Sequence, residues 1–203
     1  MVISPKADKT KQRILNAAAK LFREKGYASV SIRTIAKMAN MKAGSVYYHF
    51  ASKEVIVIEV LNIGIQKVLE HVETAISHLP EKALPSQRIH TGIYAHLTAL
   101  FEFSDYTSAN VRIFGQVPEN AQKENLEIRR QYEGLWDQIL RSANLTKVNQ
   151  NDIDLKTIRL LLIGSLNATL EWFNPEGGDV SKLARDYADM LLHGILDKTE
   201  DKG

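Results

Sequence analysis

Residues 31–53 carry the pattern that most constrains the fold: two short apolar helical stripes separated by a single turn. Ser31 is suited to cap a helix, because its hydroxyl accepts a hydrogen bond from an unpaired N–H of the first turn. From Ile32 to Ala39, apolar residues recur at positions i, i+3, i+4 and i+7, which is the spacing of one buried helical face. Asn40 tolerates left-handed backbone angles and therefore predicts a turn after this helix.

A second short helix is predicted over residues 42–50. Val46 and Phe50 stand one turn apart and form its inward face. The outward side opens with three small residues, Ala43 to Ser45, which would let the backbone enter a DNA major groove about 12 Å wide. Two short helices with one turn and a polar outer face predict a helix-turn-helix.

The outward side chains predict how this motif contacts DNA. Tyr47, Tyr48 and His49 carry donors suited to phosphate oxygens, and Arg33 suits guanine O6 and N7. Lys53 follows a predicted helix cap, where a bound phosphate would offset the unfavourable position of a cation; a solvated surface lysine is the alternative. The predicted DNA-binding residues are Arg33, Thr34, Lys42, Ala43, Ser45, Tyr47, Tyr48, His49 and Lys53.

This stretch resembles the TetR family of one-component transcriptional regulators. The matching residues are Gly26-Tyr27, Ser31, Ile35-Ala36, Ala39, Gly44-Ser45-Val46-Tyr47-Tyr48-His49-Phe50 and Ser52-Lys53-Glu54. The chain departs from the family pattern at Asn40-Met41, where Gly-Val is common, and at Lys42-Ala43, where Ser-Lys is common. These departures bear on the DNA sequence that is preferred, whereas the resemblance implies the same mode of binding.

Composition excludes several other classes of protein. The chain has no cysteine, so disulfides, zinc–thiolate sites and thiol catalysis are excluded. No hydrolase elbow, zinc-protease motif or phosphate loop occurs, so no catalytic residue, metal ligand or cofactor is predicted. His71 and His78 could share a helical face, yet no third ligand accompanies them. Without a long apolar run or a signal peptide, the expected location is the cytoplasm.

Charge is distributed unevenly along the chain. Residues 1–50 hold ten Lys/Arg and two acidic residues, a net +8, so the remainder carries −6 of the total of +2. A basic N-terminal part on an acidic body is the electrostatic footprint expected of a protein that binds a polyanion. The basic stretch from Lys6 to Arg13 could lie along DNA, although a disordered arm is an equal alternative.

An all-α fold with two domains is predicted: a three-helix DNA-binding domain over residues 1–53 and a ligand-binding and dimerisation domain over 54–203. The first helix runs from Lys9 to Lys25, ended by Gly26. Residues 54–77 contain many β-branched residues, but their apolar spacing is helical, so a helix is predicted there. Five further helices are expected near 86–103, 107–115, 118–143, 152–173 and 180–196.

An aromatic-rich stretch over residues 94–114 predicts a small-molecule site, because such sites combine aromatic walls with a few polar groups. An ordinary helical core would account for the same residues. The predicted ligand-binding residues are Tyr94, Phe101, Tyr106, Arg112, Phe114, Trp136, Asn167, Glu171 and Trp172. The stretch from Leu166 to Gly178 is similar to TetR-family members that sense coenzyme A thioesters, which implies a bulky acyl effector.

Helix 152–173 is apolar nearly all round and must be covered on more than one side. The resemblance implies that the last two helices form a four-helix homodimer interface, although a core within one subunit would explain the same residues. The predicted interface residues are Gly164, Ala168, Ala184, Ala188, Leu191 and Ile195.

The predicted function is a ligand-responsive repressor that binds a palindromic operator as a homodimer and is released by a small hydrophobic effector such as an acyl-CoA thioester. Two alternatives stay open: an architectural protein that binds DNA without sequence preference, and a regulator that senses an aromatic or drug-like molecule.

Overall fold

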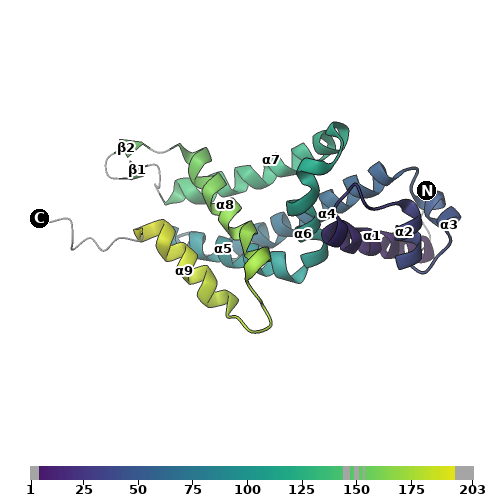
Figure 1. Ribbon diagram of the computed structural model, residues 1–203. Coiled ribbons are helices and arrows are strands. Elements are labelled where there is room, and N and C mark those ends of the chain that lie inside the picture. The colour runs from purple at the N-terminus through teal and green to yellow at the C-terminus, as the bar shows by residue number, and fades with distance from the viewer. Residues whose placement is uncertain (1–4, 144–146, 149–150, 153, 195–203) are drawn as a thin grey trace, which may run out of the picture. The chain divides into compact units, whose positions relative to one another are not determined.

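The computed structural model describes residues 5–143, 147–148, 151–152 and 154–194, and nearly all of them are helical (Figure 1). In chain order the elements are α1 (Pro5–Lys25), α2 (Ile32–Met38), α3 (Ala43–His49), α4 (Lys53–Ser77), α5 (Pro85–Glu102), α6 (Ser104–Ile113), the short 3-10 helix η1 (Phe114–Gln116), α7 (Glu119–Ser142), α8 (Leu155–Trp172) and α9 (Val180–His193). The only strands in these ranges are β1 (Lys147–Val148) and β2 (Asn151–Asp152), which pair antiparallel. The predicted all-α class is confirmed.

Helix α4 is continuous from Lys53 to Ser77, so the helical spacing of its apolar residues prevailed over their β-branched composition. Helix α1 begins at Pro5, four residues before the predicted start at Lys9. Proline fits the first turn of a helix because the N–H that it lacks would have no intrahelical partner there. Gly26 ends α1 with a φ of 73°, the left-handed angle that a glycine tolerates best.

The chain divides into two compact units. The first contains residues 1–69 and 99–132, and the second contains residues 70–98 and 133–203. Helices α4, α5 and α7 contribute residues to both units. The predicted domain border between residues 53 and 54 stays a prediction.

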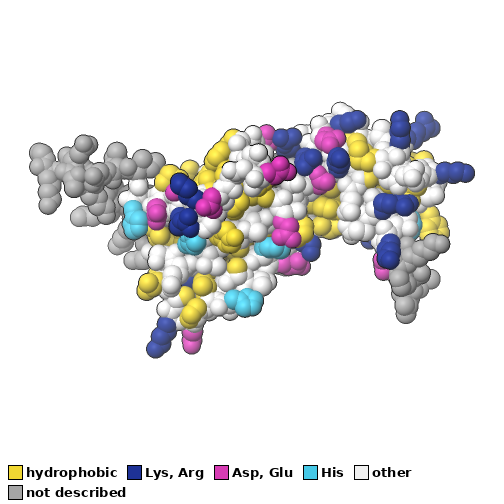
Figure 2. Space-filling view, turned by 90° about the horizontal axis from the view of Figure 1, so that it is seen from below, with side chains coloured by type: hydrophobic (Ala, Val, Ile, Leu, Met, Phe, Trp, Pro, Cys, Tyr) yellow, Lys and Arg dark blue, Asp and Glu magenta, His cyan; other side chains and the backbone are white. Residues whose placement is uncertain are grey.

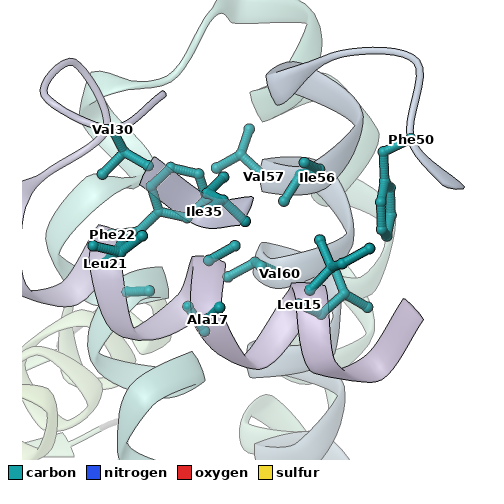
Figure 3. Close-up of a cluster of buried hydrophobic side chains, with 14 of the residues drawn as sticks. Leu15, Ala17, Leu21, Phe22, Val30, Ile35, Phe50, Ile56, Val57 and Val60 are labelled. Atoms are coloured by element: carbon teal, nitrogen blue, oxygen red, sulfur yellow. The ribbon is translucent and has the colours of Figure 1, made fainter. Parts of the chain in front are cut away.

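One hydrophobic core fills the first unit. It joins Phe22 of α1, Ile35 of α2, Phe50 after α3 and Val60 of α4, all nearly inaccessible to solvent, and Figure 3 shows how these side chains converge. Ala109 and Ile113 of α6 belong to the same cluster. The three N-terminal helices therefore depend on α4 and α6 for part of their core.

Polar contacts join α6 to α1 in addition to this core. The Tyr106 hydroxyl donates to Asn16 Oδ1 at 2.6 Å and accepts from Gln12 Nε2 at 2.9 Å. Arg112 Nη1 donates to the Arg23 carbonyl at 3.2 Å. Desolvation by burial raises the pKa of Tyr106 to about 12, so the phenol stays neutral and keeps its proton for Asn16.

A chain of side-chain hydrogen bonds connects α4, α6 and α7 inside the first unit. Arg129 donates through Nη2 to Asn110 Oδ1 and through Nε to Asn125 Oδ1 at 2.6 Å. Asn110 Nδ2 donates to the Leu61 carbonyl, also at 2.6 Å, and Asn125 Nδ2 donates to Asn62 Oδ1 at 2.8 Å. Because polar groups buried without partners are costly, this network fixes how the three helices align.

Helices α4 and α6 touch at Gly64, which predicts a steric effect of substitution. A Cβ at this position would lie 2.7 Å from the Tyr106 carbonyl oxygen and 3.3 Å from the Asn110 Cβ. We therefore expect Gly64→Ala to destabilise the protein by about 1–3 kcal/mol, measured by urea unfolding, despite the better helix propensity of alanine.

Gly134→Ala in α7 is the matched control for Gly64→Ala. A Cβ on Gly134 meets nothing within 4 Å, so only the gain in helix propensity of about 0.5–1 kcal/mol is expected. Equal stabilisation by both substitutions would show that α4 and α6 do not meet at Gly64.

In the second unit, polar contacts join α8 to α7 and α9. Arg159 of α8 is buried and forms ion pairs with Asp137 and Glu133 of α7. The Tyr187 hydroxyl of α9 donates to the Ser165 carbonyl of α8 at 3.1 Å. Across the ranges that the structure describes, we find no helix with the length and apolar character required to cross a membrane.

A buried histidine lies in the interior of the second unit. His96 of α5 is only 1% exposed, and its ring lies edge-on to that of Trp136, with the centroids 6.3 Å apart. Desolvation by burial lowers the pKa of His96 to about 4, against a smaller opposing effect from its hydrogen bond with Asn167. The imidazole is therefore neutral at pH 7.

This low pKa predicts a loss of stability in acid. An unfolded histidine titrates near pH 6.5, so below that pH the unfolded chain binds a proton that folded His96 refuses. Neutral His96 therefore contributes fully to stability above about pH 7. The free energy of unfolding declines as the pH falls towards 4, by roughly 3 kcal/mol in total. Urea unfolding of wild type and His96→Gln between pH 7 and 4.5 tests this, since the variant should lose less stability over that range. Parallel pH profiles would contradict it.

Candidate nucleic-acid interface

Helix α2 begins with a reciprocal cap. The Thr34 N–H donates to Ser31 Oγ at 3.2 Å, and the Ser31 N–H donates to Thr34 Oγ1 at 2.9 Å. The Thr34 hydroxyl also donates to the Ser31 carbonyl at 2.7 Å. The predicted cap at Ser31 is confirmed, and Thr34, which was predicted to contact DNA, uses its hydroxyl for this capping box.

The turn between α2 and α3 forms at Asn40, whose φ is 51°, as the sequence predicts. The Met41 N–H then donates to the Ala36 carbonyl at 3.0 Å, which closes the turn. Val46 and Phe50 are fully buried behind α3. Their burial fixes the rotation of α3, so that its opposite side faces solvent.

The solvent side of α3 is formed by small and aromatic side chains. Gly44 and Ser45 are exposed, and a Cβ added to Gly44 would meet nothing within 4 Å. Tyr47 is 57% and Tyr48 86% exposed, although both are large aromatic residues. Such exposure is unusual for tyrosine in a folded protein and is typical of residues that contact a partner.

Basic side chains surround this helix-turn-helix. Arg33 and Lys37 of α2 and Lys42 before α3 are exposed. In the view of Figure 2, Lys and Arg are the prevailing charged side chains over α1, α2 and α3. This distribution agrees with the net charge of +8 over residues 1–50.

A cleft of about 590 Å³ lies between α1 and α3. Four predicted DNA-binding residues, Lys42, Ser45, Tyr48 and His49, line it. Thr10 and Arg13 of α1 line its other side, and neither residue was among the predicted DNA-binding residues. The signal that could have identified them was present, because the basic stretch from Lys6 to Arg13 adjoins the motif in the N-terminal part of the chain.

Lys53 occupies a specific position that differs from that of a solvated lysine. Its ammonium donates to the Tyr27 carbonyl at 3.1 Å and lies 3.9 Å from the centre of the Tyr27 ring. The Tyr27 hydroxyl donates to Glu54, and burial with the nearby Glu54 carboxylate raises the pKa of Tyr27 to about 12. Lys53 thus ties α4 to the end of α1, and its predicted contact with DNA stays a prediction.

The nine predicted ligand-binding residues divide between the two units. Phe101, Tyr106, Arg112 and Phe114 belong to the first unit, where Tyr106 and Arg112 contact α1 and Phe114 stacks on Arg129 at 3.7 Å. Tyr106, Arg112 and Phe114 thus connect helices within the first unit.

The other five ligand-binding predictions lie in the second unit. Trp136 is fully buried and Asn167 hydrogen-bonds His96, whereas Glu171 and Trp172 are exposed. Tyr94 lines a groove of about 430 Å³ between α4 and α5, together with Glu70, His71 and Thr98. Trp136 and Asn167 both contact His96. A role in ligand binding stays a prediction for all nine residues.

The predicted dimer residues also have different environments. Gly164 and Ala168 lie on an exposed side of α8, beside exposed Leu160, Leu161 and Trp172. By contrast, Ala184 and Ala188 of α9 are buried within the subunit and Leu191 is half-buried. Ile195 lies outside the described residues.

The fold and this interface together define a class of protein: a helix-turn-helix DNA-binding regulator. Two family patterns match the chain, "Bacterial regulatory proteins, tetR family" over residues 14–60 and "Tetracyclin repressor-like, C-terminal domain" over residues 82–195. The chain belongs to the TetR family. Members of this family are transcriptional regulators that bind DNA operators.

Relatives of known role are similar over nearly the full length. The HTH-type transcriptional repressor KstR2 of Rhodococcus jostii is 26% identical over 94% of this chain and 96% of its own length. The fatty acid metabolism regulator protein of Bacillus subtilis is 26% identical over 92% of this chain and 95% of its own.

Solved structures show the same fold. PfmR of Thermus thermophilus, a TetR-family transcriptional regulator, superposes with a TM-score of 0.76 at 26% identity, covering 91% of this chain and 100% of its own. FadR of Bacillus subtilis, solved in complex with stearoyl-CoA, gives a TM-score of 0.71 at 24% identity, covering 91% of this chain and 99% of its own; this second likeness concerns the fold alone.

Proposed function

We propose that this protein is a homodimeric repressor that binds a palindromic operator through α3 and is released by a hydrophobic acyl effector. The observation that carries the proposal is the outward side of α3, where small residues and exposed tyrosines stand among basic side chains and the inward side is fixed by buried Val46 and Phe50. A helix of this shape fits a major groove, and the surrounding cations suit the phosphates on either side.

The homodimer is supported by the exposed apolar side of α8. Leu160 is 57% and Leu161 69% exposed in the single subunit, and the small residues Gly164 and Ala168 are exposed on the same helix. Contiguous exposed apolar residues mark a protein interface, and small residues allow helices to approach closely. In a symmetric dimer bound to a palindrome, the two α3 helices would lie about 34 Å apart, which is one turn of DNA.

The class of effector is proposed from the similarity to the fatty acid metabolism regulator, which extends over 92% of this chain. The stretch from Leu166 to Gly178 supports the same class. Because a ligand shifts an equilibrium only by its differential affinity, the effector must bind the DNA-incompetent form more tightly, typically by ~1–3 kcal/mol.

Operator release tests the proposed effector class. A duplex is first selected from a random library with the purified full-length protein, and its dissociation is followed by fluorescence anisotropy. Stearoyl-CoA should weaken binding of this duplex by roughly 5- to 150-fold, whereas coenzyme A alone should not. Release by coenzyme A alone, or no release by any acyl-CoA chain length, would reject the acyl effector and leave the DNA-binding function standing.

Arg33 provides a test of base recognition. We expect Arg33→Ala to weaken binding to the selected duplex by about 1–3 kcal/mol per half-site, since a bidentate contact with guanine contributes that much discrimination. Binding to a scrambled duplex, measured at the same salt concentration, should fall much less and serves as the internal control. An equal loss on both duplexes would mean that Arg33 contacts only the phosphate backbone.

A further inference from the structure

Three consecutive residues of α1 turn their side chains towards three different helices. Lys11 pairs with Glu59 of α4 at 2.8 Å. Gln12 donates to the Tyr106 hydroxyl of α6 at 2.9 Å. Arg13 is exposed and lines the cleft between α1 and α3. Ile14, which follows, is fully buried and fixes the rotation of the helix, so Arg13 is held at the cleft by the core beneath it.

The lining of this cleft has the chemistry of an anion site. Arg13 and Lys42 supply two cations from opposite sides, and Thr10, Ser45 and Tyr48 supply hydroxyl groups. None of the lining residues is acidic. The groove between α4 and α5 differs, since its lining contains Glu70 and neither lysine nor arginine.

The position of the cleft indicates which anion it binds. It adjoins the exposed side of α3 at Gly44, Ser45 and Tyr48, the side that would enter a major groove. The walls of a major groove are the two phosphate backbones, so a duplex seated on α3 brings one backbone to the edge of the helix. On the edge that faces α1, that backbone would meet Arg13 and Lys42.

We propose that Arg13, with Lys42 and Thr10, binds a phosphodiester of the operator backbone in this cleft and thereby sets how α3 sits in the groove. The inference rests on the proposed function and adds α1 to the DNA-contacting surface. A guanidinium binds phosphate through two parallel N–H···O contacts, which fix orientation as well as adding charge. Because every base step carries the same phosphate, Arg13 contributes affinity and register without reading sequence.

The salt dependence of operator binding tests this site. Each neutralised phosphate contributes about 0.9 to the slope of log K against log salt on duplex DNA. Arg13→Gln should therefore lower the slope by ~1.8 for a dimer on two half-sites, and weaken binding roughly 30-fold at 0.15 M salt. Arg13→Lys should retain the slope. Lys20→Gln, which removes the same charge from an exposed position on the same helix, is the control and should change neither value.

Neutral methylphosphonate linkages in the selected duplex locate the contact. At one phosphate per half-site, the methylphosphonate should lower the operator affinity of the wild-type protein strongly and that of Arg13→Gln hardly at all. Both changes remove the same interaction, so their effects should not add. Additive losses at every phosphate, or a slope for Arg13→Gln equal to that of Lys20→Gln, would overturn the inference. If instead the wild-type protein selected no duplex, the proposed function itself would fail.

Discussion

Replacing Trp136 by alanine is expected to destabilise the protein by about 3–5 kcal/mol, the largest effect on folding of the substitutions considered. The indole is completely buried in the second unit, and a Cβ on Gly92 would lie only 3.3 Å from its ring. His96 lies edge-on to the same ring. Removing the indole leaves a cavity that these close neighbours can fill only in part.

Trp172→Ala is the matched control, because Trp172 is 60% exposed and its loss should cost the isolated subunit little. The chain contains two tryptophans, so each variant retains a single fluorophore. Urea unfolding monitored by circular dichroism measures the stabilities, and fluorescence reports which indole is shielded from water. Similar destabilisation by the two substitutions would contradict the burial of Trp136.

Leu161→Glu is expected to weaken operator binding strongly by destabilising the dimer. Leu161 is 69% exposed in the subunit, so a carboxylate there should leave the fold of the subunit unchanged. In a dimer that buries this side of α8, an unpaired charge costs several kcal/mol. The dimer should weaken by roughly 100-fold or more, and operator affinity should fall with it, because a monomer occupies only one half-site.

Leu84→Glu controls for the introduced charge. Leu84 precedes α5 and is 61% exposed, so the same substitution at a similar exposure should leave the protein dimeric. Sedimentation equilibrium measures the dissociation constants of both variants. A Leu161→Glu protein that remains dimeric and binds the operator normally would show that the interface lies elsewhere.

The helix-turn-helix could be predicted because its determinants are local. Ser31 caps α2, Asn40 adopts the predicted left-handed turn, and Val46 and Phe50 are buried together. Each of these features depends on residues within a few positions of one another, and their spacing is visible in the sequence. The helical nature of residues 54–77 was predicted correctly for the same reason.

The environment of the aromatic stretch could not be predicted, because it depends on long-range packing. Tyr106 was chosen as a ligand-binding residue from composition, yet its hydroxyl bonds Asn16 and Gln12, some ninety residues away. The same holds for the α9 residues, since helical spacing identifies a buried stripe without revealing what covers it. Ala184 and Ala188 are covered within the subunit, while Gly164 and Ala168 are not.

Arg13 shows what sequence reasoning overlooks close to a recognised motif. Its charge was counted in the basic N-terminal stretch, but its direction depends on the rotation that buried Ile14 imposes on α1. Lys11 and Arg13 are only two residues apart, and one pairs with Glu59 while the other faces α3. Which of these cations is available to DNA follows from the fold alone.

The duplex that the full-length protein selects from a random library tests the central claim most directly. Two twofold-related α3 helices predict a palindrome whose half-site centres are separated by about 34 Å, one helical turn of DNA. We expect the wild-type protein to enrich such a palindrome. The enrichment should be lost in Leu161→Glu and kept in Leu84→Glu. A library that shows no enrichment, or a selected site without twofold symmetry, would contradict the claim that a symmetric dimer reads DNA through α3.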